Sequence, residues 1–295
     1  MLTLVVFCAH TVLGVAAVLV VGRSRIQRAY AALFLVCGFI LEWFAPFDSC
    51  LRAILAWGGM IALAATIKSA ASATPRWPVW NRLLDLVSVP YPLRAGRTRP
   101  TLSLPIIGRF ILEGLFGSAA LLTLWQTTPA VHSSGAIIAV FRLIAGVIFI
   151  YAMLEFLTDF FFLAGGVSLH STHRAPIAAR SLREFWGQRW NRIASALLHR
   201  FVFLPLARRH RPGLGLFCAC LVSGVLHAWP AMVALGAFAA FTTATFFCLQ
   251  GVLILAEDRL HVHAWPVLVA RTWTLVILLA SSPLVIDPFL RMFHL

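Results

Sequence analysis

Residues 213–255 read GLGLFCACLVSGVLHAWPAMVALGAFAAFTTATFFCLQGVLIL and contain no Asp, Glu, Lys or Arg. A helix needs roughly 20 apolar residues to cross the ~30 Å hydrocarbon core of a bilayer. This stretch is therefore long enough for two membrane-spanning helices, which we expect at residues 213–229 and 232–255. The only histidine in the stretch, His227, falls well inside the first of them.

The rest of the chain repeats this pattern. Further apolar runs of spanning length lie at residues 2–21, 30–46, 49–67, 104–124, 137–162 and 264–282. Of the 295 residues, 61% are hydrophobic and 12% are charged, whereas soluble domains carry roughly 25% charged residues. We therefore expect an all-α, polytopic membrane protein with about eight transmembrane helices, organised as a single domain over residues 1–295.

Basic residues outnumber acidic ones, with 24 Lys and Arg against 10 Asp and Glu. In a soluble protein this excess would suggest nucleic-acid binding. Here most basic residues lie between apolar runs, at 22–29, 68–103, 163–212 and 256–263, and cytoplasmic loops of membrane proteins collect Lys and Arg. We expect no nucleic-acid partner, an N-terminus outside the cytoplasm and long basic loops inside it.

The amino-acid composition also indicates the kind of organism that encodes the chain. Arg and Ala are abundant and Lys68 is the only lysine, a bias typical of GC-rich bacterial genomes. The expected location is therefore the bacterial inner membrane.

Two of the basic segments are too long to be simple turns. In the first, residues 69–103, aromatic and basic residues alternate, as in an amphipathic helix of the headgroup layer or a membrane-anchored loop. In the second, residues 193–207 are apolar on average but interrupted by His199, Arg200 and Pro205. They are too few and too charged to span a bilayer, so we expect a re-entrant or interfacial segment there.

His227 is the first candidate for a catalytic residue. At 1.5 Å per residue it lies ~21 Å along its helix. An ionisable side chain at this depth is costly, and by default it is a functional candidate that faces a cavity. A neutral imidazole there can accept a proton, as a general base must. The alternative is a histidine that packs between helices and hydrogen-bonds to a neighbouring carbonyl.

Residues 181–191, SLREFWGQRWN, form the second candidate motif. On a helix, Arg183, Trp186 and Trp190 share one face. The alternative interpretation is an aromatic belt at the membrane interface with solvated arginines.

Together, SLREFWGQRWN and the later SGVLH at 223–227 resemble the membrane-bound O-acyltransferase superfamily. More narrowly they resemble its wax synthase-like group, whose hallmark is a SLxxFWGxRWN-like segment ahead of an SGxxH-like one. The stretches FFCLQGVLILAED at 246–258 and RTWTLVILLASSPLVIDPFL at 271–290 are also similar to that group. The resemblance is strongest over residues 155–290.

The resemblance implies an integral-membrane acyltransferase that moves an acyl group from acyl-CoA to a hydroxyl. It implies that His227 is the general base and that Asn191 is the second catalytic residue, which binds the developing oxyanion or orients the acceptor. Acyl-CoA is then a co-substrate, and we expect no cofactor and no metal. The expected partners are acyl-CoA, a lipid or other hydroxyl-bearing acceptor, and membrane lipids.

The expected substrate-binding residues belong to the same two motifs. Among the arginines, Arg183 and Arg189 are the first candidates to bind the phosphates of CoA, because guanidinium groups suit phosphate. Trp186, Trp190 and Ser223 complete the expected binding residues.

The chain departs from the family pattern at one position. Many relatives have an acidic residue after the histidine, whereas Ala228 follows His227 here. Another carboxylate could supply the charge, or the base could work without it. The candidates are Glu155, Asp159, Glu184 and Glu257. The alternative for these acids is salt bridging at the membrane interface.

Two other functions compete with the acyltransferase. A multi-pass transporter or structural protein would use the intramembrane charges Glu42, Glu113, Arg142 and Arg271. A histidine-rich, metal-dependent lipid oxidase would need clustered ligands, and the chain offers His170 with His173 and His261 with His263 beside Glu257.

Overall fold

The computed structural model describes residues 2–21, 24–44, 48–71, 104–128, 136–165 and 171–295. Every regular element in these ranges is a helix. The long helices are α1 (Leu2–Val20), α2 (Arg25–Phe44), α3 (Ser49–Ala71), α5 (Leu104–Thr127), α6 (Ala136–Gly165), α10 (Pro212–Leu235), α11 (Ala237–Leu260), α12 (Val267–Ser281) and α13 (Pro283–Met292). The short ones are η1 (Pro176–Ala178), α7 (Leu182–Glu184), η2 (Phe185–Arg189), α8 (Arg192–Leu198), η3 (His199–Phe203), α9 (Leu204–Ala207) and η4 (Val262–Ala264).

The apolar helices confirm the expected all-α membrane architecture. Six helices of the described chain are long and apolar enough to cross a membrane, and α12 with α13 makes a seventh if this pair, bent by 46°, counts as one span. The apolar stretch Val5–Val20 of α1 is shorter than a full span. Each of the eight predicted runs thus corresponds to a helix, and the protein is an integral membrane protein. The expectation for the loop up to residue 103 falls on 72–103, outside the described residues.

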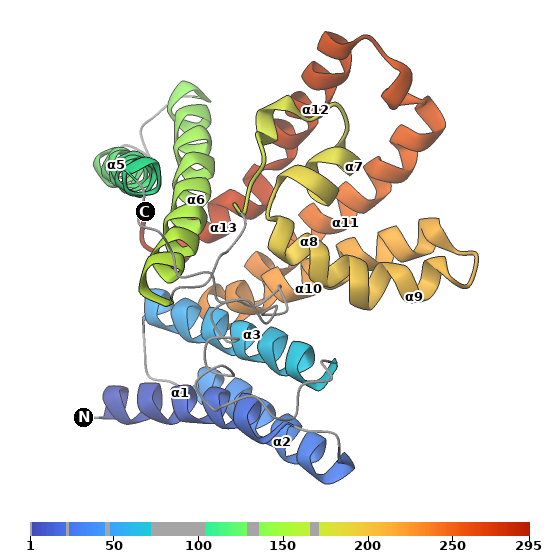
Figure 1. Cartoon of the computed structure of the whole chain (residues 1–295). Coiled ribbons are helices and arrows are strands. Elements are labelled where there is room, and N and C mark those ends of the chain that lie inside the picture. Colours follow the sequence, from blue (N-terminus) through green and yellow to red (C-terminus); the bar gives the residue numbers. More distant parts are fainter. Residues whose placement is uncertain (1, 22–23, 45–47, 72–103, 129–135, 166–170) are drawn as a thin grey trace.

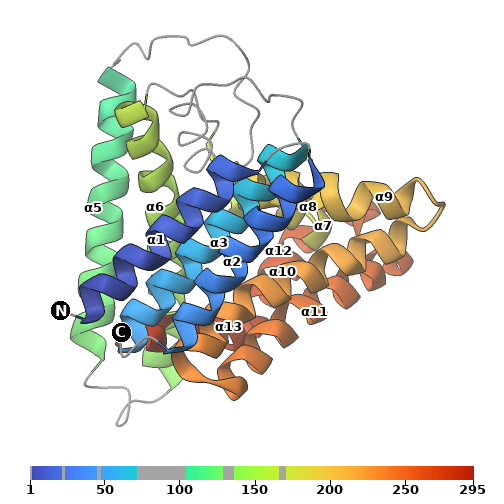
Figure 2. The same ribbon diagram turned by 90° about the horizontal axis from the view of Figure 1, so that it is seen from below.

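The helices form three groups (Figures 1 and 2). Helices α1, α2 and α3 pack together, α10 pairs with α11, and α5 pairs with α6. Helix α10 also packs against α3, and α13 contacts α6, α10 and α11. The end of the chain lies against the start of α3, where Ser49 Oγ donates to the carbonyl of Met292 at 3.2 Å. The groups are therefore joined through α10 and α13.

The α10–α11 hairpin depends on two glycines. Gly236 adopts φ +94° in the turn, a conformation that a residue with a Cβ rarely takes. Gly224 lies one turn before His227, and a Cβ there would lie 3.1 Å from Phe247 Cβ and 3.3 Å from the carbonyl of Ala244. Its missing side chain therefore lets α11 approach α10 next to His227.

The segment predicted to be re-entrant or interfacial is helical throughout. Helix α8, the π-helical turn η3 and α9 follow one another over residues 192–207, and the chain then reverses into α10. The two arms touch at Gly215, where an added Cβ would lie 3.0 Å from the carbonyl oxygen of Phe203. The segment thus forms a helical hairpin with α10, the helix that carries His227.

Candidate active site

A cavity of about 1800 Å³ lies between α3, α6, α8, α10, α11 and the α12–α13 pair. Most of its lining is apolar, and it extends from Arg183 of α7 to Phe293, which directly follows α13. Sites for drug-sized ligands usually measure about 300 to 1,000 Å³. The cavity is therefore large enough for molecules with long chains.

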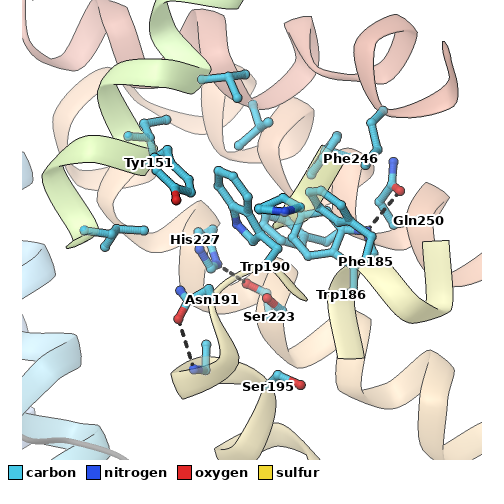
Figure 3. A pocket seen from close by; sticks show the side chains of 18 of the residues that line it. Tyr151, Phe185, Trp186, Trp190, Asn191, Ser195, Ser223, His227, Phe246 and Gln250 are labelled. Atoms are coloured by element: carbon cyan, nitrogen blue, oxygen red, sulfur yellow. Dashed lines mark hydrogen bonds between the residues drawn. The ribbon is translucent and has the colours of Figure 1, made fainter. Parts of the chain in front are cut away.

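His227 lies in the wall of this cavity (Figure 3). Its Nδ1 is 2.8 Å from the backbone carbonyl oxygen of Ser223. A carbonyl can only accept a hydrogen bond, so Nδ1 carries a proton. In the neutral ring, Nε2 then keeps its lone pair and can accept a proton from another group.

Aromatic side chains hold the imidazole on two sides. Phe247 of α11 packs with a ring separation of 4.4 Å, and Trp57 of α3 meets the ring edge-on at 5.4 Å. Both also line the cavity. His227 thus shows the geometry of both alternatives, since it hydrogen-bonds to a carbonyl of its own helix and also faces a cavity.

Asn191 lines the same cavity and has an unusual backbone. With φ 37° and ψ 60° it is left-handed, a conformation that Asn tolerates better than most residues. Its Oδ1 accepts from the backbone N–H of Ala194 at 3.1 Å and so caps α8. Since the oxygen is used by the cap, the amide nitrogen remains as a donor (Figure 3).

The two tryptophans of SLREFWGQRWN line the cavity as well. Trp186 Nε1 donates to Gln250 Oε1 at 3.2 Å, and Gln250 Nε2 donates to Ser281 Oγ at 2.9 Å. Trp190 stacks on Phe185 with a centroid separation of 5.5 Å. These contacts fix both indoles as part of the wall (Figure 3).

The two candidate arginines differ in their surroundings. Arg183 lines the cavity, and its side chain is half exposed beside Asp258, with which it forms an ion pair. Arg189 is not among the lining residues. It donates to Glu184 Oε1 at 2.7 Å and to the carbonyl of Ala175 at 3.1 Å, so its hydrogen bonds are made within the chain.

Glu184 is held as a carboxylate by these neighbours. Burial raises its pKa, but the hydrogen bonds from the N–H of Arg180 and from the Arg189 guanidinium outweigh burial and hold the pKa below its usual value. This ion pair therefore braces the turn that precedes Asn191.

The other acidic candidates have partners apart from His227. Glu155 hydrogen-bonds to His173, and Asp159 pairs with Arg109. Glu257 accepts from the backbone N–H of Leu182 at 2.8 Å and from Trp273 Nε1 at 3.0 Å. None of these four carboxylates therefore replaces the acidic residue that Ala228 lacks. The imidazole of His227 is oriented by the carbonyl of Ser223 instead.

Where the structure describes them, the residues that a transporter or a metal-dependent oxidase would need do not form a site in the cavity. None of the four intramembrane charges lines the cavity, and one of them, Arg142, donates to the carbonyl of Leu124 at 2.9 Å. The described residues contain no group of three or more His, Cys, Asp or Glu side chains placed to hold a metal ion. His170 lies outside the described residues.

Sequence reasoning missed several residues of the site. Trp57, Tyr151 and Phe247 look like any other aromatic residue of an apolar helix, and only the packing brings them to the cavity. Gln250 could have been predicted from the sequence, because it is the only side-chain amide within the apolar run of α11. A polar group at such a position needs a partner.

Comparison with known proteins supports the motif-based interpretation. Residues 170–249 match the profile of the Membrane bound O-acyl transferase family. The chain is also similar to three proteins of Arabidopsis thaliana that are named probable long-chain-alcohol O-fatty-acyltransferases. Number 7 is 32% identical over 124 residues, which are 38% of this chain and 37% of the relative. Number 3 is 34% identical over 104 residues, which are 32% and 30%. Number 2 is 30% identical over 108 residues, which are 34% and 32%.

The chain thus spans about a third of the length of the curated relatives that it matches. The matched residues include both SLREFWGQRWN and SGVLH. The resemblance that these motifs predict is confirmed: residues 170–249 are similar to the Membrane bound O-acyl transferase family, and the chain is similar to relatives named as long-chain-alcohol O-fatty-acyltransferases.

Proposed function

We propose that the protein is an O-acyltransferase that transfers a fatty-acyl group from acyl-CoA to the hydroxyl of a lipid-like acceptor. One observation carries the proposal: a histidine with a proton on Nδ1 faces a large apolar cavity that also contains the Asn191 amide. The similarity to enzymes named for long-chain alcohols supports a fatty alcohol as the acceptor.

In the proposed reaction, His227 Nε2 accepts the hydroxyl proton while the acceptor oxygen attacks the thioester carbonyl. The carbonyl oxygen becomes negative, and the Asn191 amide donates a hydrogen bond to it. The C–S bond then breaks and the imidazolium gives its proton to the leaving thiolate. The products are an ester and free CoA, and His227 returns to its neutral form.

The apolar cavity supports this chemistry in two ways. Each buried methylene of an acyl chain contributes roughly 0.8 kcal/mol of binding free energy. A cavity with few polar groups also holds little water, which slows hydrolysis of the thioester. Long chains in both substrates would therefore improve binding and protect the donor.

The phosphates of CoA need a polar, positively charged end of the cavity. That Arg183 both lines the cavity and reaches solvent supports this role for it. We therefore propose that acyl-CoA enters beside α7, on the side of the basic loops. In the bacterial inner membrane this side would be the cytoplasm, with the N-terminus on the opposite face.

The test is ester formation by the purified protein from acyl-CoA and a long-chain alcohol. We expect H227A to lose ester formation, because the change removes the Nε2 lone pair that accepts the hydroxyl proton. The matched control is H210N, since His210 is exposed and left-handed, a conformation that Asn accepts. Ester formation by H227A at the rate of the unmutated protein would refute the proposal.

A further inference from the structure

The residues before Asn191 are paired with a loop from another part of the chain. The backbone N–H of Arg174 donates to the carbonyl of Arg189 at 2.8 Å, and the N–H of Arg192 donates to the carbonyl of Thr172 at 2.8 Å. These two bonds lie on either side of Asn191 and Trp190. The loop of residues 171–174, which we call the bracing loop, therefore holds the backbone at Asn191 from both sides.

The bracing loop is in turn fixed by one carboxylate of α6. Glu155 Oε1 accepts from the backbone N–H of His173 at 2.5 Å and from His173 Nδ1 at 2.9 Å. Ser171 Oγ lies 3.1 Å from the same oxygen, and its single proton has a closer acceptor in the carbonyl oxygen of His173 at 2.6 Å. Glu155 is 2% exposed. A buried carboxylate that binds both the backbone N–H and the imidazole of His173 is a strong anchor, because each lost bond would leave a polar group unsatisfied.

The imidazole of His173 transmits this anchor to the cavity wall. Its side chain is fully buried between Trp190, at a centroid distance of 4.5 Å, and Tyr151, at 4.6 Å. Both neighbours line the cavity, whereas Glu155 and His173 do not. Within the part of the chain that the structure describes, His173 Nε2 has no hydrogen-bond partner, so the bond to Glu155 is the one hydrogen bond that orients the ring.

Asn191 needs such support. A left-handed backbone at a residue with a Cβ is strained by about 1 to 3 kcal/mol and persists only where its surroundings enforce it. The same backbone decides where the Asn191 amide points. A misplacement of about 1 Å can lower a rate by roughly 100-fold.

We propose that Glu155 is a positioning residue for Asn191. Through His173 and the bracing loop it holds Asn191 in the conformation that directs its amide into the cavity. The inference rests on the proposed function, in which that amide binds the oxyanion.

The test is a double-mutant cycle on ester formation by purified, monodisperse protein. N191A removes the donor and is expected to lower kcat by about 100- to 1,000-fold. E155Q keeps the size of the side chain but replaces one acceptor oxygen with a donor, and it is expected to lower kcat by about 10- to 100-fold with little change in KM for acyl-CoA. The double variant should be no slower than N191A alone, because both changes remove the same interaction.

The matched control is D159N. Asp159 lies one turn after Glu155 on α6 and is as deeply buried, but it pairs with Arg109 of α5 instead of the bracing loop. Its effect should multiply with that of N191A. If E155Q does not fold, S171A provides a milder change, since it removes the hydrogen bond from Ser171 Oγ to the carbonyl of His173 within the bracing loop and leaves both bonds from His173 to Glu155 in place. S171A should slow the unmutated protein and leave N191A unaffected.

The outcomes separate this inference from the proposed function. Effects of E155Q and N191A that multiply, or an E155Q variant with unchanged kcat, would overturn the positioning role alone. An N191A variant with unchanged kcat would overturn both the positioning role and the oxyanion donor. Ester formation by H227A at the rate of the unmutated protein would overturn the proposed function itself.

Discussion

The indole Nε1 of Trp229 donates to Glu42 Oε2 at 2.6 Å. The other oxygen of Glu42 bonds to His10 Nε2 at 2.8 Å, and Glu42 is fully buried. Helices α1, α2 and α10 thus meet at one carboxyl group. Trp229 lies two residues after His227, so this contact fixes α10 close to the proposed base.

Breaking this contact should destabilise the protein. W229F leaves Glu42 Oε2 without its indole donor, at an expected cost of about 1 to 3 kcal/mol in the free energy of unfolding. Thermal unfolding in detergent measures the effect. The control is W125F, because Trp125 is 67% exposed. Equal melting temperatures for the two variants would show that the Glu42 contact contributes no stability.

Gly59 should not tolerate a methyl group. A Cβ at this position of α3 would clash with Glu42 Oε1 and would lie 3.2 Å from the ring of Phe39. We expect G59A to displace the carboxyl group and to lower the melting temperature. G108A is the control, since a Cβ at Gly108 has nothing within 4 Å. A G59A variant as stable as G108A would contradict the described packing.

The hydrogen bond between Gln250 and Trp186 should affect the rate through His227. Trp186 packs against Phe247 at 5.9 Å, and Phe247 packs against His227. Q250L removes the acceptor for the indole and is expected to lower kcat about 10-fold. Q250E retains an acceptor oxygen and should keep more activity. A Q250E variant as slow as Q250L would indicate that the bond to Ser281 matters instead.

Arg183 should affect the donor substrate alone. R183A is expected to raise KM for acyl-CoA by roughly 10- to 100-fold, because a hydrogen bond between charged groups contributes about 1.5 to 3 kcal/mol. A short thioester without phosphates should react equally well with both proteins. If R183A raises KM for both donors by the same factor, the arginine does not bind phosphate.

Glu184 should make stability depend on pH. Its pKa in the folded protein lies below the usual value, so its stabilising effect is complete above about pH 4.3, the ordinary glutamate pKa. The effect is then lost as pH falls toward the lower folded pKa. The difference in melting temperature between the unmutated protein and E184Q should be largest near neutral pH and shrink below about pH 4. A difference that stays constant into acid would disprove this role.

The sequence predicts the membrane helices well because each needs only a long apolar run. The predicted helix ends are less accurate, notably at a proline. The expected end of the first helix at residue 229 is wrong, since α10 continues through Pro230 to Leu235. A proline removes one backbone hydrogen bond but need not end a helix in a membrane. Gly236, with its positive φ, provides the turn instead.

Only part of the candidate site could be predicted from the sequence. Both motifs reach one cavity, as the positions of His227 and Asn191 show. The surroundings of Arg189 could not be foreseen, because its carbonyl partners belong to a loop whose position depends on tertiary packing. The same holds for Glu155, whose role follows from contacts with residues 16 to 18 positions away.

The central claim is that His227 Nε2 accepts the proton of the acceptor hydroxyl. H227N tests it most directly, because the Asn amide can still donate to the carbonyl of Ser223 but offers no base at the Nε2 position. We expect H227N to fold and to bind acyl-CoA with unchanged affinity, while ester formation in a single turnover falls by about 100- to 10,000-fold. Ester formation by H227N at the rate of the unmutated protein would contradict the account.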